Sequence, residues 1–262
     1  QLLNQAGALV HVYKDGSIYL NHGGTEMGQG LFIKVAQVVA NEFGVKLDQV
    51  KVSATSTSKV PNTSPTAASS GSDLNGMAAK EACIRIKRNL CDFAVQHFGV
   101  DVNDVNFEDS NVFLGDKKMT FKEFISLAFL NRVELFSNGY YKTPKIYYDE
   151  AKKQGRPFFY YSYGVCLSEV IVDCLTGEYK LVAVDILHDV GASLNPAIDM
   201  GQIVGGFIQG MGWLCSEELK WDDSGVLLTT GASTYKIPAI GDTPEHFNVK
   251  IKPNISNHEN TI

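Results

Sequence analysis

The stretch of sequence that decides the fold is Gly23-Gly24-Thr25-Glu26-Met27-Gly28-Gln29-Gly30. Four of its eight residues are glycine, a residue that allows positive φ angles and lets the backbone approach a ligand closely. Two apolar runs, residues 9–13 and 18–20, precede the stretch and flank Asp15-Gly16, a signal for a β-hairpin. Apolar residues at helical spacing over residues 33–43 follow it, and Gly44 is a natural helix end. The pattern predicts a hairpin, a glycine-rich turn and a helix in succession.

A Ser/Thr-rich stretch over residues 53–72 lies between a predicted strand at residues 50–54 and a predicted helix at residues 73–90. Eleven of its twenty residues are serine or threonine. Such hydroxyls can satisfy the backbone of a loop or belong to a low-complexity linker. Together with the backbone amides before a helix N-terminus, they can also bind a phosphate without basic residues.

The middle of the chain gives weaker signals. Residues 100–118 are polar and are predicted to be irregular. Thr120 and Glu123 have the spacing of a capping box, which predicts a short helix beginning there.

The second half repeats the first in outline. Strands are predicted at residues 163–172 and 179–186, and Asn195-Pro196 provides an N-cap and a first helical residue. Met-Gly-Gln occurs at residues 27–29 and again at residues 200–202, each time after a hairpin and a loop. We therefore expect an α+β fold of mixed β-sheets with packed helices, built from two related strand–loop–helix halves, with sub-lobes at residues 1–140 and 141–262.

Composition excludes several classes of protein. The net charge is −6 and no basic cluster stands out, which argues against nucleic acid as a partner. No apolar run approaches the roughly 20 residues of a membrane span. The five cysteines form no Cys-x-x-Cys pair, which favours free thiols in a reducing compartment. The histidines have no metal-ligand spacing, and the glycine-rich stretch is neither a dinucleotide fingerprint nor a Walker loop.

Several motifs together identify a family, and they occur in the family's order. They are residues 3–7 (LNQAG), 23–30 (GGTEMGQG), 61–69 (PNTSPTAAS), 168–170 (SEV), 173–177 (DCLTG), 189–191 (DVG), 193–199 (SLNPAID) and 233–238 (STYKIP). From Gln1 to about Lys252, the chain resembles the second molybdenum-cofactor-binding domain of the eukaryotic xanthine dehydrogenase and aldehyde oxidase family, the molybdenum hydroxylases.

The resemblance implies roles for individual residues. Gln29 would hydrogen-bond the molybdenum centre, and Leu3 would line the substrate channel. The metal would be held by the dithiolene of molybdopterin, with no protein ligand. The remaining cofactor-binding positions implied by the resemblance are Gly28, Thr66, Ala67, Ala68, Ser69, Ser70, Ser72 and Gln202, with Ser70 and Ser72 on the phosphate side.

The resemblance also implies the chemistry of the intact protein. Members hydroxylate purines, converting hypoxanthine and xanthine to urate, with oxygen from water and a glutamate as base. Electrons leave through 2Fe-2S clusters to FAD on other domains of the same polypeptide. The intact enzyme would be a homodimer in the cytoplasm or the peroxisome.

The family's catalytic glutamate stands in a Gly-Glu-Pro-Pro motif that this sequence does not contain. We therefore expect residues 1–262 to be part of the cofactor-binding domain, inactive alone and free of molybdenum when isolated. Two alternatives stay open at this point. One is an aldehyde oxidase fragment, because purine and aldehyde specificity depends on another domain. The other is a truncated, non-catalytic paralogue that serves as a binding or assembly module.

Overall fold

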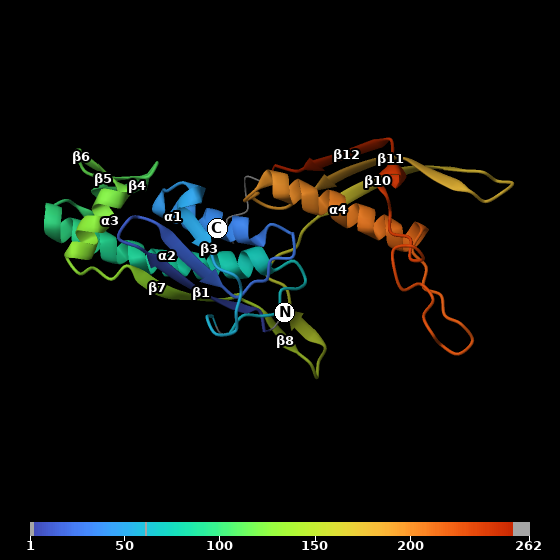
Figure 1. Cartoon of the computed structure of the whole chain (residues 1–262), viewed down its shortest axis with the longest axis horizontal. Helices are drawn as coiled ribbons and strands as arrows, with labels where there is room; N and C mark the ends of the chain where they lie inside the picture. Colours follow the sequence, from blue (N-terminus) through green and yellow to red (C-terminus); the bar gives the residue numbers. More distant parts are fainter. Residues whose placement is uncertain (1–2, 61, 254–262) are drawn as a thin grey trace. The chain divides into compact units, whose positions relative to one another are not determined.

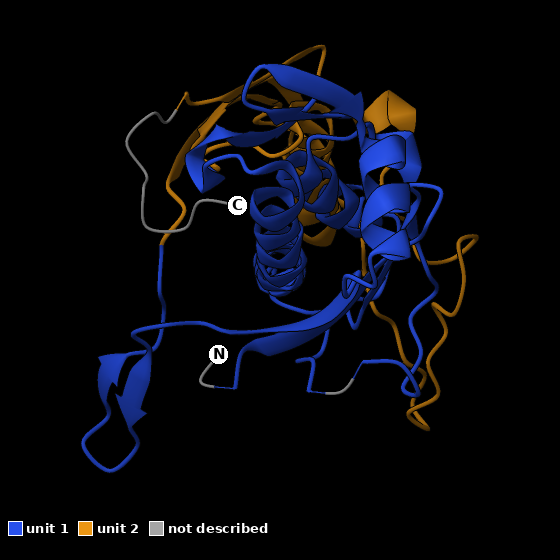
Figure 2. Ribbon diagram, turned by 90° about the vertical axis from the view of Figure 1, so that its left-hand side faces the viewer, with its two compact units in different colours: residues 1–160, 262 blue, residues 161–261 orange. Residues whose placement is uncertain are grey.

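The structure is a computed structural model that describes residues 3–60 and 62–253. Pro61, within the Ser/Thr-rich stretch, and residues 254–262 lie outside the described residues. The chain divides into two compact units, residues 1–160 and residues 161–261, coloured separately in Figure 2. No helix among the described residues combines the length and apolar character that a membrane span requires.

In the first unit, helices separate short groups of strands along the chain (Figure 1). Its strands are β1 (Gln5–Val12), β2 (Ile18–His22), β3 (Val50–Val52), β4 (Val105–Glu108), β5 (Asn111–Leu114), β6 (Lys117–Thr120), β7 (Phe136–Lys142), β8 (Tyr147–Asp149) and β9 (Gln154–Arg156). Its helices are α1 (Leu31–Phe43), α2 (Gly71–Phe98) and α3 (Phe121–Leu130).

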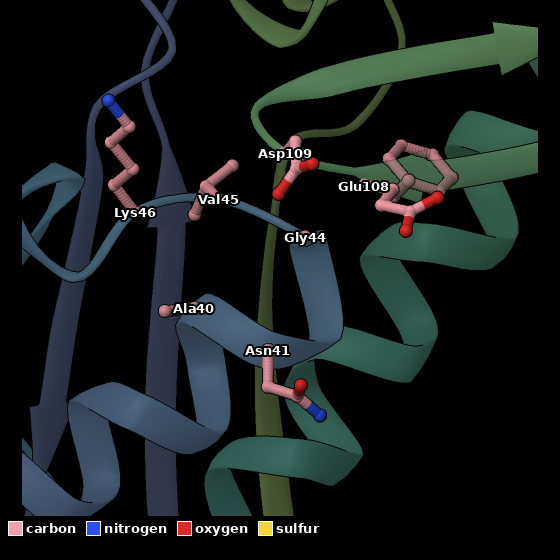
Figure 3. A pocket seen from close by; sticks show the side chains of 8 residues that line it. Ala40, Asn41, Gly44, Val45, Lys46, Glu108 and Asp109 are labelled. Atoms are coloured by element: carbon pink, nitrogen blue, oxygen red, sulfur yellow. The ribbon is translucent and has the colours of Figure 1, made fainter.

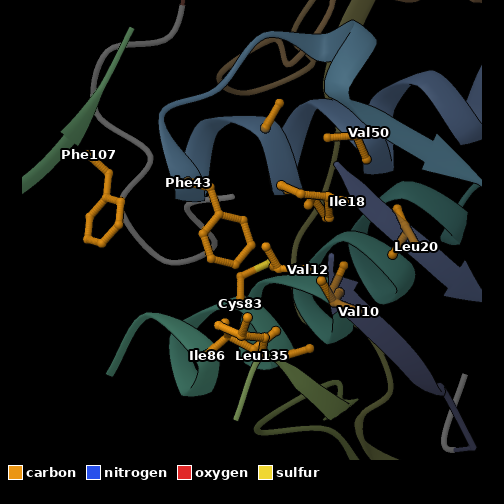
Figure 4. Packing of buried hydrophobic residues seen from close by; sticks show 14 of the residues in the cluster. Val10, Val12, Ile18, Leu20, Phe43, Val50, Cys83, Ile86, Phe107 and Leu135 are labelled. Carbon is orange, nitrogen blue, oxygen red and sulfur yellow. The ribbon is translucent and has the colours of Figure 1, made fainter. Parts of the chain in front are cut away.

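A four-stranded sheet of order β3-β2-β1-β7 forms the base of this unit, with β2 and β3 parallel and the other pairs antiparallel. Helices α1 and α2 pack together, and α2 also packs against β1 and β7. Side chains from these elements interlock in one hydrophobic core, in which Val10, Phe43 and Ile86 are fully buried (Figure 4). The close approach of β7 to α2 requires Gly139, because a Cβ there would lie 2.0 Å from the carbonyl oxygen of Ala78.

The predicted hairpin, glycine-rich turn and helix are confirmed. β1 and β2 pair in antiparallel register, and residues 23–30 lead from β2 directly into α1. α1 is followed by Gly44, which forms a left-handed C-cap. Its φ is +59°, and its backbone N–H donates to the carbonyls of Ala40 and Asn41. A Cβ at Gly44 would also overlap the backbone of Phe107, so the helix end and the packing beneath it require the same glycine.

The helix expected at residues 73–90 is confirmed but is longer, running from Gly71 to Phe98. Its buried face continues beyond Leu90 through Phe93 and Ala94, and Gly99 ends it with a φ of +68°. The capping box of α3 is present as predicted, with Thr120 and Glu123 each bonded to the other's backbone N–H.

The expectation that residues 100–118 are irregular is wrong. They contain β4 and β5 and the start of β6, which form a three-stranded antiparallel sheet. Each strand has only four residues, and one face of the sheet is polar, so the alternation is too short to stand out from a loop. The turn at Asp109-Ser110 is made by positive φ angles in both residues, a conformation uncommon outside glycine.

The second unit contains a hairpin, a helix and a returning strand. These elements are β10 (Gly164–Val172), β11 (Tyr179–His188), α4 (Pro196–Cys215) and β12 (His246–Ile251). β10 and β11 are antiparallel, and β12 is parallel to β11. α4 begins as predicted, with the Asn195 side chain accepting from the N–H of Ile198 and proline at the first helical residue. The α+β fold class with mixed sheets is confirmed.

Candidate functional site

The glycine-rich stretch lies at the carboxyl end of β2 and at the N-terminus of α1. Its first two glycines are required by close packing. A Cβ at Gly23 would lie 2.2 Å from the Thr63 hydroxyl oxygen, and a Cβ at Gly24 would lie 2.6 Å from the side-chain nitrogen of Asn75. Gly28 is different, because among the described residues no atom beyond its two chain neighbours lies within 4 Å of the position of its Cβ. The beginning of the stretch, at Gly23 and Gly24, is therefore packed tightly against other residues, whereas its end, at Gly28, is open.

Hydrogen bonds join this stretch to the Ser/Thr-rich residues. The backbone N–H of Thr25 donates to the Thr66 hydroxyl at 2.9 Å, and the Thr55 hydroxyl donates to the carbonyl of Gly24 at 2.7 Å. The N–H of Gly24 donates to the Asn75 side-chain oxygen at 3.1 Å, and Asn75 in turn donates to the carbonyl of Gly71. The two segments expected to contact one cofactor thus form one connected surface, next to the N-terminus of α2.

Leu3 belongs to the same neighbourhood. Its carbonyl accepts from the Ser64 hydroxyl at 2.7 Å, and the backbone N–H of Ser64 donates to the carbonyl of Gln5 at 2.9 Å. The Leu3 side chain is 80% exposed. Leu3 is therefore anchored through its backbone beside the Ser/Thr-rich residues while its side chain is free to contact a small molecule.

The segment from Ala67 to Ser70 is an exposed turn before α2. Ala68 and Ser69 both have a φ of +55°, a backbone conformation that costs energy in residues with a Cβ and is concentrated at functional sites. The Ser70 hydroxyl donates to the carbonyl of Ala67 at 3.2 Å and makes no side-chain cap to α2. Ser70 thus leaves the N-terminus of α2 without a side-chain cap, and such a helix end favours an anion.

Gln29 is held by its own loop. Its side-chain oxygen accepts from the N–H of Met27 at 2.6 Å, and its side-chain nitrogen donates to the carbonyl of Thr25 at 2.9 Å. Both neighbours are backbone groups that can only donate or only accept, so they fix which way the amide faces. Glu26 accepts backbone N–H groups in the same loop. Burial raises the pKa of Glu26, but these N–H groups outweigh it and leave the pKa below its ordinary value.

His22, directly before the stretch, is 3% exposed. Its Nδ1 accepts from the N–H of Gly24 at 3.2 Å, and its ring packs edge-on against Phe32. Burial lowers the pKa of His22 to about 4, although the nearby Glu26 carboxylate acts in the opposite direction. The imidazole is therefore neutral near pH 7 and supports the turn.

Two buried polar groups near the site were not predicted. The Asp73 carboxylate, in the first turn of α2, accepts from the Tyr160 hydroxyl at 3.2 Å. Burial, with the charge of Asp73, raises the pKa of Tyr141 to about 12 and raises that of Tyr160 further. Asn75 is the other group, and it is 2% exposed. Neither had a local signal in the sequence, because both depend on contacts between distant segments.

Gln202 lies in the second unit, on the exposed side of α4 within its first turns. The structure places the other expected positions, Leu3, Gly28, Gln29 and residues 66–72, in the first unit. The role of Gln202 therefore stays a prediction.

A pocket of about 420 Å³ lies elsewhere, at the C-terminus of α1 (Figure 3). It is bounded by Asn41, Gly44 and Lys46 on one side and by the turn after β4, with Glu108 and Asp109, on the other. It is at the opposite end of α1 from the glycine-rich stretch and shares no residue with it. Within residues 3–60 and 62–253, no three His, Cys, Asp or Glu side chains converge as a metal-ligand set.

The first unit thus presents a surface of backbone amides, hydroxyls and one oriented carboxamide, which is typical of a protein that holds a large polar cofactor. The chain belongs to the molybdopterin cofactor-binding domain family, whose model matches residues 1–244. It is 47% identical over 249 residues to a xanthine dehydrogenase/oxidase from Felis catus, covering 95% of this chain and 17% of that protein. It is 46% identical over 258 residues to xanthine dehydrogenase 1 from Arabidopsis thaliana, covering 96% of this chain and 18% of that protein. The predicted resemblance is confirmed, and the chain spans less than a fifth of the length of these relatives.

Solved structures show the same fold. Quinoline 2-oxidoreductase from Pseudomonas putida 86 matches with a TM-score of 0.80 and 23% identity, over 95% of this chain and 31% of that chain. The aldehyde oxidoreductase from Desulfovibrio desulfuricans matches with a TM-score of 0.72 and 24% identity, over 95% of this chain and 24% of that chain.

The residues present fit molybdopterin. The open space at Gly28, the residue before Gln29 in the chain, leaves room for a bound group. The backbone at Ala68 and Ser69, with its positive φ angles, and the N-terminus of α2, which has no side-chain cap from Ser70, offer hydrogen-bond donors without a basic side chain. Such a surface suits a neutral ring system that carries one phosphate.

Proposed function

We propose that the intact protein is a molybdenum hydroxylase that acts on purines, converting hypoxanthine and xanthine to urate with oxygen from water. One observation carries this proposal: the Gln29 loop and the Thr66–Ser72 segment form one connected surface in a chain that is similar to xanthine dehydrogenases over nearly all of its length. The molybdenum cofactor would supply the redox chemistry.

The chain's own residues would bind the cofactor and fix its orientation. The Gln29 amide would donate toward the metal end of the cofactor, and the backbone of Ala67, Ala68 and Ser69 would contact the pterin. Ser70 and Ser72, with the N-terminus of α2, would bind the phosphate. The remaining expected contacts are Gly28 and Thr66 along the same surface, Gln202 at the pterin and Leu3 at the substrate channel.

We infer that residues 1–262 alone do not turn over substrate and carry no molybdenum. The surface described here offers oriented donors but no general base, since the sequence lacks the Gly-Glu-Pro-Pro motif of the family. The 2Fe-2S clusters and FAD would lie on other domains of the same polypeptide, in a homodimer. Because all five cysteines are free thiols, we place the protein in a reducing compartment, the cytoplasm or the peroxisome.

Steady-state assays of the full-length protein test the substrate class. We expect urate from xanthine, with kcat/KM for xanthine above that for benzaldehyde. A preference for benzaldehyde would make the protein an aldehyde oxidase. No turnover of either substrate, at full molybdenum content, would favour the non-catalytic binding module. Molybdenum analysis and the same assays on residues 1–262 test the inferred inactivity, and turnover there would contradict it.

A further inference from the structure

The Glu26 carboxylate organises the open end of the glycine-rich stretch. One oxygen, Oε1, accepts from the N–H of Gly28 at 2.8 Å and from that of Gly30 at 3.0 Å, and Oε2 accepts from the N–H of Phe32 at 2.9 Å. Gly30 is the N-cap residue of α1 and has no side chain with which to cap it. Glu26 therefore serves as the missing cap from four residues upstream, where a negative charge is favoured by the helix dipole.

This arrangement depends on the glycines. Gly28 has a φ of +94° and Gly30 a φ of +78°, and these angles turn alternate N–H groups of the loop inward to the same carboxylate oxygen. Gln29 lies between them, so the backbone on both sides of Gln29 is tied to Glu26. The carboxylate is partly buried and ionised near neutral pH, because the N–H groups hold the pKa of Glu26 below its ordinary value.

The orientation of the Gln29 side chain is set by the backbone of this turn. Its amide bonds Thr25 and Met27 in the same turn, so any change in the path of residues 26–30 moves the amide as well. A carboxamide nitrogen carries two hydrogens. One donates to the carbonyl of Thr25 at 2.9 Å, and among the contacts of the described residues the other has no acceptor.

We propose that Glu26 is a positioning residue that holds the Gln29 amide with one N–H directed toward the cofactor. This inference rests on the proposed function. Glu26 itself touches neither the cofactor nor the substrate, and it acts through the three backbone N–H groups that fix the turn.

The test uses the full-length protein and the variant Glu26→Gln, which keeps the size of the side chain and removes the charge and one acceptor oxygen. We expect kcat for xanthine to fall between about tenfold and about a hundredfold, because small displacements of positioning groups have effects of this size. KM and molybdenum content should change little. Hydrogen exchange of the peptide spanning residues 23–33 should become faster.

Glu123→Gln is the matched control. Glu123 is also a capping carboxylate, bonded to the N–H and hydroxyl of Thr120 at the start of α3, but α3 is not part of the proposed cofactor surface. This variant should leave kcat unchanged. Gly28→Ala is a second variant, because Gly28 has a φ of +94°, which a residue with a Cβ rarely adopts. Where Glu26→Gln folds poorly, Gly28→Ala should still speed the hydrogen exchange of residues 23–33, a readout that does not depend on contact between residue 28 and the cofactor.

The double variant Glu26→Gln/Gln29→Ala separates positioning from general stability. If Glu26 acts through Gln29, its substitution should add almost nothing to the effect of Gln29→Ala. The inference would be overturned if Glu26→Gln lowered kcat by the same factor in the wild type and in the Gln29→Ala variant. Loss of molybdenum from the Glu26→Gln variant would also overturn it. If Gln29→Ala alone has no effect, the failure lies in the proposed role of Gln29. If Gln29→Ala slows turnover and Glu26→Gln does not, only the present inference fails.

Discussion

Residues 1–160 and 161–253 begin with the same order of elements, an antiparallel hairpin, a helix and a strand parallel to the second strand of the hairpin. They differ in what covers the sheet. In the first unit α2 and β7 join this arrangement and enclose one hydrophobic core. In the described part of the second unit, the buried hydrophobic residues are Val184 and Ile186, while Leu167 and Trp213 are 71% and 64% exposed.

This difference bears on the proposed cofactor-binding residues, which lie on differently packed scaffolds in the two units. The Gln29 loop runs from a buried strand into a buried helix, and Asn75 ties it to a second helix. A site on such a scaffold keeps its geometry without a ligand. Gln202 is on a helix that packs on its own sheet through a contact between Phe207 and Phe247 and has no comparable core beneath it. Exposed apolar surface on this scale marks a face that another part of a protein covers.

The largest expected effect comes from separating the units. Expressed alone, residues 1–160 should unfold cooperatively in urea, because their core is complete. Residues 161–261 alone should show no cooperative transition and should bind the dye ANS, which reports exposed apolar surface. A sharp unfolding transition in the second unit would contradict the comparison.

The next effect concerns single apolar side chains, one from the hairpin of each unit. Leu20 in β2 is fully buried, and Leu167 in β10 is 71% exposed. Leu20→Ala should lower the free energy of unfolding by about 2–5 kcal/mol. Leu167→Ala should change it by no more than about 0.5 kcal/mol. Urea titrations of the two variants of the chain measure both, and similar losses would show that the second unit has a core of its own.

A smaller effect is the pH dependence of the stability of the first unit. His22 has a pKa of about 4 in the folded protein and about 6.5 when unfolded. The unfolded chain therefore gains a proton between pH 6.5 and 4 that the folded protein does not bind, and stability falls as the pH falls through this window. From pH 7 to pH 5 the loss should be about 2 kcal/mol. His22→Asn, which keeps an acceptor for Gly24, should remove this part of the pH dependence, and an unchanged profile would show that His22 is not responsible.

The elements that could be predicted from the sequence are those with a complete local signal. Asp15-Gly16 and Gly44 mark a hairpin and a helix end by themselves, and Asn195-Pro196 marks the start of α4. The sheet of β4, β5 and β6 escaped prediction because its strands are short and one face is polar.

The residues of the candidate site also fall into those that could be assigned from the sequence and those that could not. Gln29 and residues 66–72 could be assigned from the family motifs, and the glycines gave a physical reason to look there. Asn75 and Glu26 could not be assigned roles, because one depends on a contact 51 residues away and the other on the exact path of the turn. The proposed role of Gln202, at an exposed position on α4, rests on the family resemblance alone.

The central claim is that the glycine-rich stretch presents Gln29 to a cofactor on a preformed surface, and Gln29→Ala in the full-length protein tests it most directly. Losing one such contact should cost about 1–3 kcal/mol, so kcat for xanthine should fall by between about fivefold and about 150-fold, with unchanged molybdenum content and an unchanged free energy of unfolding. Gln96→Ala, at an exposed position on α2, should have no effect. Equal kinetics for Gln29→Ala and the wild type would contradict the claim.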